Sequence, residues 1–196
     1  MTKNTGVIDF QREGLNDRSS QHSHFCLQIQ PGLYYPNQNM ATNYTRINRH
    51  VNAPRADIYR ALLDAQAVAA WMVPGGMTSH VHQFDAREGG TFRISLTYDE
   101  PTGTGKTTAH TDTYHGQFVK LVPNEQVIEV MEFETADTAM QGKMTVTFTL
   151  TDAKGGTEVL AVHDNLPPGL SPKDNATGWR ISLDKLAAYV EANQNT

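Results

Sequence analysis

Residues 175–192 carry a hydrophobic pattern with the spacing of a helix. Four large apolar residues recur there at steps of four, three and four: Trp179, Leu183, Leu186 and Val190. Because this spacing places them on one face, we expect an amphipathic helix of ~27 Å, at about 1.5 Å per residue. Ser171 or Asp174 offers a side-chain oxygen to cap its first N–H groups. Such a helix needs a partner surface, and the preceding chain is predicted to form it.

The segment between residues 79 and 165 alternates apolar and polar positions, which is typical of β-strands. Together with an earlier strand, we expect strands at residues 43–51, 79–84, 91–98, 111–121, 125–134, 142–151 and 157–165. Short connections between successive strands favour antiparallel neighbours. Two short helices, one opening at Pro54 and one over residues 65–71, follow the first strand. This order predicts an α+β domain whose antiparallel sheet wraps around the long C-terminal helix.

Residues 1–42 differ in composition from the rest of the chain. They are rich in Asn, Gln, Ser, Gly and His, and they show no sustained hydrophobic period apart from a strand-like segment at residues 25–35. We expect a poorly ordered extension over residues 1–42 and one folded domain over residues 43–196. Met40 is also a plausible natural start, so the sequence leaves open whether residues 1–39 belong to the native protein.

Five pieces of this domain resemble one known superfamily and follow one another in its order. They are INRHVNAPRADIYRALLDAQAVAAWMVP, FDAREGGTFRI, GQFVKLVPNEQVIEV, MTVTFTLTDAKGGTEVLAVHDNLPPG and GWRISLDKLAAYVE. They resemble the START/SRPBCC helix-grip superfamily, in the branch similar to the C-terminal domain of the heat-shock ATPase activator. The resemblance covers residues 44–192 and implies a curved antiparallel sheet of six to seven strands gripping the C-terminal helix. It also implies a mostly apolar pocket between sheet and helix, closed at one end by the short helices, and no catalytic motif common to all members.

Charge and composition exclude several classes of partner. The net charge of −5 and the lack of a dense basic run argue against nucleic acid or an anionic membrane. Cys26 is the only cysteine, which excludes an intramolecular disulfide and favours a reducing compartment. No apolar run reaches the length of a membrane span, and the first ten residues lack the layout of a secretion signal. We therefore expect a cytoplasmic protein.

The motifs for metal, phosphate and nucleophile chemistry are weak. His80 and His82 lie two apart on a predicted strand but lack a third convergent ligand, so we expect neither a metal site nor a cofactor. Residues 103–107 end in the GKT of a phosphate loop, yet they lack that loop's first glycine and lie in a hairpin. Cys26 lies outside the domain, and no GxSxG elbow marks a serine nucleophile.

Two titratable residues are the candidates for chemistry inside the domain. His163 is in step with Val159 and Ala161, which are predicted to face the helix, so it could bond a ligand or act as acid or base. A structural histidine is the competing interpretation. Glu129 is in register with Met131, which predicts either an inward carboxyl at the pocket or an irregularity of the strand.

The wall of the expected pocket consists mainly of aromatic, aliphatic and thioether side chains, for which core packing is an equally good explanation. The residues predicted to contact a ligand are Trp71, Met72, Phe92, Ile94, Met131, Phe148, His163, Trp179 and Leu183. A pocket of ~300–1,000 Å³ lined in this way suits a small apolar or aromatic molecule.

The residues are compatible with three functions. The leading hypothesis is a domain that binds a small hydrophobic molecule and catalyses no reaction. The second is an enzyme of the cyclase, dehydratase or hydrolase kind, in which His163 and Glu129 transfer protons. The third is a module that contacts a chaperone, or forms a homodimer, through the outer face of the sheet, where Leu160 and Val162 are apolar.

Overall fold

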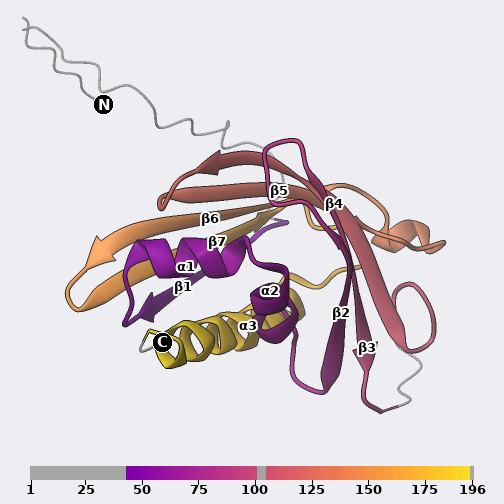
Figure 1. The fold of residues 1–196 in the computed structure, drawn as a ribbon. Helices are drawn as coiled ribbons and strands as arrows, with labels where there is room; N and C mark the ends of the chain where they lie inside the picture. Colours follow the sequence, from indigo (N-terminus) through magenta and orange to yellow (C-terminus); the bar gives the residue numbers. More distant parts are fainter. Residues whose placement is uncertain (1–42, 101–104, 195–196) are drawn as a thin grey trace, which may run out of the picture. The chain divides into compact units, whose positions relative to one another are not determined.

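A seven-stranded antiparallel sheet organises the domain. The computed structural model describes residues 43–100 and 105–194. The strand order is β1-β7-β6-β5-β4-β3-β2, so the first strand pairs with the last and all others pair with their chain neighbours. The elements are β1 (Thr45–Val51), α1 (Arg55–Leu62), α2 (Ala65–Trp71), β2 (Met77–Phe84), β3 (Thr91–Tyr98), β4 (Thr111–Val122), β5 (Gln126–Phe133), η1 (Thr138–Met140), β6 (Met144–Ala153), β7 (Gly156–Asp164) and α3 (Pro172–Ala192). The sheet curves around α3, with α1 and α2 on the same concave side (Figure 1).

This architecture is the predicted helix-grip fold, with small differences at the ends of elements. The helix α2 and the strand β3 have the predicted bounds. By contrast, α3 begins at Pro172, three residues before the predicted start, because Ser171 caps it. The Ser171 Oγ accepts the backbone N–H of Asp174 at 3.4 Å, and Pro172 fills the first helical position, where no N–H is needed.

The predictions for residues 1–42, including the strand-like segment and Met40, lie outside the described residues. Within the part of the chain that the structure describes, none of the helices combines the length and the apolar character that crossing a membrane requires.

The core fills the concave side of the sheet. All four apolar positions of the predicted helical face, Trp179, Leu183, Leu186 and Val190, are buried. In β6, Phe148 lies between two indole rings, with ring centroids 6.1 Å from Trp71 in α2 and 5.6 Å from Trp179 in α3. Burial of such side chains stabilises the fold by about 1.5–3 kcal/mol each. The aromatic contacts therefore join the sheet to both helices.

A glycine allows one aromatic ring to lie directly against the sheet. A Cβ placed on Gly116 in β4 would stand 2.4 Å from Cζ of Phe92 and 2.4 Å from the carbonyl oxygen of Val130. Any larger residue would displace the Phe92 ring, whose centroid lies 5.2 Å from that of Phe118. Gly116 thus positions the aromatic cluster beneath α1 and α2.

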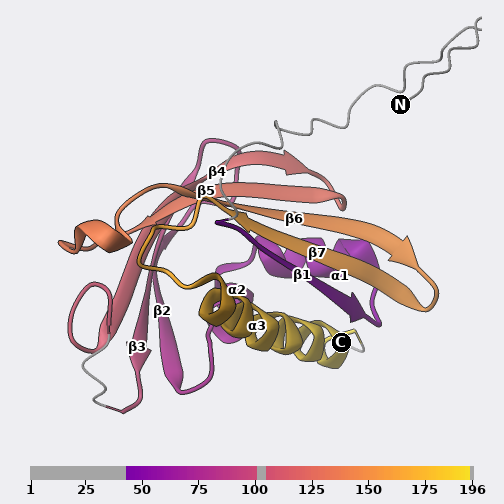
Figure 2. The same cartoon turned by 180° about the vertical axis from the view of Figure 1, so that it is seen from behind.

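The helix α3 lies along β1, with α2 packed beside it (Figure 2). Lys185 of α3 ties the turn after α2 in place, because its ammonium donates to the carbonyl oxygens of Val73 at 2.7 Å and Pro74 at 3.4 Å. On the same helix, a Cβ built on Gly178 would stand 3.9 Å from Cγ of Pro74, an ordinary van der Waals distance. The turn is therefore held by the Lys185 side chain and, at its far end, by the backbone N–H of Asp99, which donates to the carbonyl oxygen of Gly76 at 2.9 Å.

Candidate functional site

A small internal void lies between the sheet and the two short helices. Its volume is about 10 Å³, which is room for roughly one water molecule. The lining residues are Leu62, Val68, Trp71, Met72, Phe84, Phe92, Ile94, Glu129 and Phe148. The void is thus far smaller than the expected pocket, because large aromatic side chains of the sheet and of α2 fill most of the concave side. All but one of its lining residues are apolar.

The structure brings part of the predicted ligand-contacting set to this void. Five of the nine residues line it: Trp71, Met72, Phe92, Ile94 and Phe148. The other four, Met131, His163, Trp179 and Leu183, are buried on the concave side but do not line it. The sequence analysis missed Leu62, Val68 and Phe84, although the helical spacing of Leu62 and the alternation of β2 give a weak signal for two of them.

Glu129 supplies the only polar group among the residues that line this void. The alternation of β5 turns it inward, as one of the two sequence interpretations predicted, and its exposed fraction is 7%. Burial raises the pKa of Glu129 from 4.5 to about 8, because the charged carboxylate loses its hydration. Its Oε1 atom has no hydrogen-bond partner among the described residues. At pH 7 the site therefore holds a neutral carboxyl group that can donate or accept a hydrogen bond.

Tyr114 of β4 is a second buried polar group, which the sequence analysis did not single out. Its hydroxyl has no partner within residues 43–100 and 105–194. Burial raises the pKa of Tyr114, and the negative charge of Glu129 raises it further, so the two groups lie within electrostatic range of each other. The phenol therefore stays protonated. Alternation along β4 could have predicted its inward position.

His163 of β7 is buried, and its protonation is fixed by two side chains of α3. Its Nδ1 accepts the indole N–H of Trp179 at 3.0 Å and faces the amide nitrogen of Asn175 at 3.1 Å. Because Nδ1 is the acceptor, the neutral ring carries its proton on Nε2. Burial lowers the pKa of His163 to about 4, although the bond to Asn175 opposes this shift. The Nε2 atom is buried and makes no hydrogen bond to any described residue.

The register of the sheet relates these groups to one another. Glu129 pairs with Val146 of β6, and Val146 pairs with His163 of β7. Because directly paired residues of neighbouring strands point to the same face, the carboxyl and the imidazole both lie on the concave side, and their backbones are about 9.5 Å apart, two strand spacings. Glu129 Oε1 and His163 Nε2 make no hydrogen bond to each other, so the structure does not show the predicted acid–base pair in contact.

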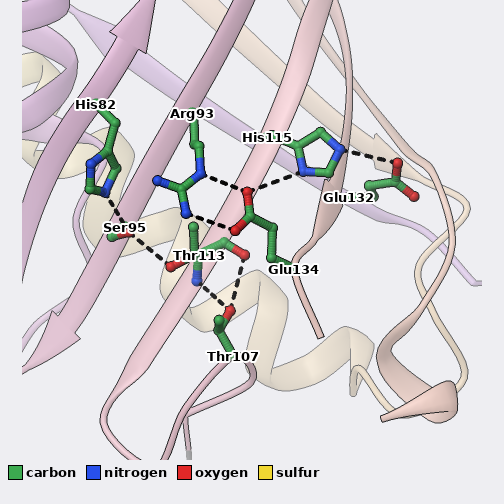
Figure 3. Close-up of polar contacts among 8 residues, drawn as sticks. All are labelled: His82, Arg93, Ser95, Thr107, Thr113, His115, Glu132 and Glu134. Atoms are coloured by element: carbon green, nitrogen blue, oxygen red, sulfur yellow. Dashed lines mark hydrogen bonds and ion pairs between the residues drawn. The ribbon is translucent and has the colours of Figure 1, made fainter. Parts of the chain in front are cut away.

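A polar network covers the outer face of β2 to β5 instead (Figure 3). Arg93 of β3 donates to both carboxylate oxygens of Glu134 at 2.7 and 2.8 Å. His115 lies between Glu134 and Glu132, at 3.5 and 3.3 Å. These partly exposed pairs contribute little stability individually. They mark the face of the sheet opposite the void.

The two strand histidines belong to the same outer face. The rings of His80 and His82 have centroids 4.5 Å apart, and Nε2 of His82 lies 2.8 Å from Oγ of Ser95. Ser95 in turn bonds Thr113 at 2.8 Å. In the described ranges, no three metal-ligating side chains converge. The His82 ring is thus used for a contact between strands.

The GKT sequence is also accounted for by a structural role. Residues 103 and 104 lie outside the described part, but Lys106 forms an ion pair with Asp112, whose carboxylate also accepts the backbone N–H of Lys106 at 2.6 Å. The ammonium lies 5.2 Å from the ring centroid of Phe133. Because its charge is already neutralised at a mostly buried position, Lys106 is not presented to a phosphate.

A larger depression is open to solvent at the end of the sheet near α1. Its volume is about 520 Å³, and polar or charged side chains make up most of its lining. Arg55 at its rim pairs with Asp152 at 2.8 Å. On the outer face, Leu160 and Val162 are half-buried. Neither surface offers the enclosed apolar environment of the internal void.

Comparison with known proteins identifies relatives of the whole domain. A family model described as Activator of Hsp90 ATPase homolog 1-like protein matches residues 52–191. Protein CV1439 from Chromobacterium violaceum is 30% identical, with a TM-score of 0.69 over 77% of this chain and 99% of that one. A search of curated proteins finds no match.

Two more distant structures share the fold. A protein from Rhodobacter sphaeroides is 21% identical, with a TM-score of 0.61 over 77% of this chain and 94% of its own. The AHSA1-like protein from Aeromonas hydrophila is also 21% identical, with a TM-score of 0.56 over 76% and 92% of the two chains.

Proposed function

Because the chain belongs to the family of Activator of Hsp90 ATPase homolog 1-like proteins, we propose that its domain binds a small, largely apolar molecule between the sheet and the helices. The observation that carries this proposal is the buried Oε1 of Glu129, which has no hydrogen-bond partner among the described residues and belongs to a carboxyl at an otherwise apolar internal void. Leaving a buried polar group unpaired costs about 1–3 kcal/mol, and a ligand that bonds it offsets part of that cost. Glu129 is then the polar anchor, and the apolar lining covers the rest of the molecule.

Binding requires the void to widen, and the end of α2 is the segment best suited to move. Met72 lines the void and is half-buried, so it lies between the interior and the surface. The turn that follows contains Gly76 at φ 73° and is tied to α3 through Lys185. Outward movement of this turn breaks the two Lys185 hydrogen bonds and the bond from the Asp99 N–H to the Gly76 carbonyl, and it leaves the strand pairs of the sheet intact.

The test uses prodan, a neutral naphthalene with a propionyl carbonyl at one end and a dimethylamino group at the other. Equilibrium dialysis measures its affinity for the full chain and for two variants that add the same bulk. Val68→Phe fills the void from α2, whereas Val119→Phe adds its ring at a half-exposed position. We expect saturable binding, weakened at least tenfold by Val68→Phe and less than twofold by Val119→Phe. Absence of saturable binding, or equal affinity of all three proteins, contradicts the proposal.

Acid catalysis is the second candidate function, and it is favoured by the raised pKa of Glu129. A carboxyl that is still protonated at neutral pH can donate a proton to a bound molecule. His163 does not assist at the same atom, because its Nδ1 is engaged by α3 and its ring lies across Val146. An enzyme would turn over a compound with a rate that Glu129→Gln abolishes, whereas a binding domain returns every bound compound unchanged in mass.

The remaining expectations stay predictions. Contact with a chaperone and formation of a homodimer both depend on the outer face around Leu160 and Val162, and size-exclusion chromatography with light scattering tests the second of them. A cytoplasmic location likewise stays a prediction.

A further inference from the structure

We propose that His163 is a second anchor of the same site, so that the bound molecule is elongated, uncharged and carries a hydrogen-bond acceptor at each end. This inference rests on the proposed function. Two side chains of α3, Trp179 and Asn175, fix which nitrogen of the His163 ring carries the proton. Because Nδ1 accepts from Trp179, Nε2 is an N–H donor and not an acceptor.

This donor has nothing to donate to in the described structure. Nε2 is buried and unpartnered, and Nδ1 faces α3, so the N–H points away from Trp179 and Asn175. Unpartnered buried donors are rare in folded proteins and call for a specific explanation. An acceptor atom of a bound molecule is such an explanation, and an ordered water is the competing one.

The spacing of the two anchors gives the length of the molecule. Glu129 and His163 flank Val146 on the concave face, and their backbones are about 9.5 Å apart, two strand spacings. Phe148, two residues along β6, lines the void and also contacts Trp179, whose indole N–H bonds His163. His163 itself does not line the void, so a molecule that reaches both anchors must lengthen the void past Val146 and Phe148, both of which are buried. A rigid apolar body with an acceptor at either end matches this arrangement.

The lack of charged groups at the site restricts the class of ligand. No basic side chain lines the void, and both anchors are neutral at pH 7, since burial raises the pKa of Glu129 and lowers that of His163. A carboxylate or phosphate would enter the interior without a counter-ion, which is strongly unfavourable. Carbonyl, ether or aromatic tertiary amine groups are neutral at pH 7 and accept hydrogen bonds without that penalty. Aromatic ketones and related neutral compounds are therefore the expected class.

The experiment compares prodan with its analogue in which a methylene group replaces the carbonyl. Equilibrium dialysis with the intact chain should show prodan bound about tenfold more tightly, the usual effect of one buried hydrogen bond. In this test the carbonyl of prodan is the acceptor assigned to His163. His163→Phe should therefore lower the affinity for prodan to that for the analogue and leave the affinity for the analogue unchanged. His115→Phe on the outer face is the matched control and should alter neither.

A nitrogen NMR experiment on the unmodified protein keeps the test independent of any variant. The His163 ring should show the Nε2–H tautomer, and prodan, but not the analogue, should shift the Nε2–H proton resonance downfield. If both probes bind equally and this resonance does not move, His163 faces water only and the inference is wrong while the proposed function stands. If neither probe binds, the proposed function itself fails.

Discussion

Replacement of Glu129 by glutamine should make the protein more stable at neutral pH, by an amount that grows with pH. Folding raises the pKa of this carboxyl from 4.5 to about 8, so unfolding releases a proton throughout that interval. The folded state is therefore favoured fully below pH 4.5 and loses stability as pH rises towards 8. Each pH unit in that interval removes about 1.4 kcal/mol, so Glu129 costs the wild-type protein about 2.5 kcal/mol between pH 5 and pH 7.

The assay is urea unfolding at pH 5, 6, 7 and 8, followed by the fluorescence of Trp71 and Trp179. Glutamine does not titrate, so the difference in unfolding free energy between Glu129→Gln and wild type should rise by about 2.5 kcal/mol from pH 5 to pH 7. All other titrating groups cancel in this difference. The control is Glu132→Gln on the outer side of the same strand, whose partly exposed pair with His115 should contribute less than about 1 kcal/mol. A difference that stays constant with pH would show that Glu129 ionises normally, and the neutral anchor would be lost.

Three further predictions concern other residues, and urea unfolding measures the free energy of unfolding in each case. Because folding lowers the pKa of His163 to about 4, the free energy of unfolding of the wild type should fall by about 2 kcal/mol as pH falls from 6.5 to 4.5. His163→Gln should remove this fall, and the same pH dependence in the variant and the wild type would contradict the prediction. Gly116→Ala should cost at least about 2 kcal/mol, whereas Gly75→Ala, which meets no atom within 4 Å, should be nearly neutral; equal effects would refute the close approach. Asp112→Ala should cost about 3 kcal/mol by leaving the Lys106 ammonium unpaired, and a second change of Lys106 to methionine should restore part of it; strict additivity of the two changes would exclude the pair.

The fold could be predicted from the sequence because its signals are local and repeat along the chain. Alternation identified each strand, the steps of four and three identified the buried face of α3, and Pro54 marked the start of α1 within one residue. The start of α3 was missed by three residues because either Ser171 or Asp174 could cap a helix, and only the geometry of the first turn decides between them.

The candidate site was predictable only in part. Alternation along β5 and β7 predicted that the side chains of Glu129 and His163 point inward. It could not predict that Val146 of β6 lies between them, which follows from the pairing of β6 with both strands. The small size of the void could not be predicted, because it depends on how the aromatic rings around Phe148 pack. Likewise, the pairing of Lys106 with Asp112 joins the two sides of a loop that the sequence shows only as a weak phosphate motif.

A molecule that binds this domain should lie at the Glu129 void rather than at the surface. Intermolecular NOEs from prodan to assigned methyl groups test this directly. We expect contacts to the methyl groups of Leu62, Val68 and Ile94, which line the void, and none to Val122, which lines the open depression. Contacts to Val122 without those to the void residues would contradict the central claim.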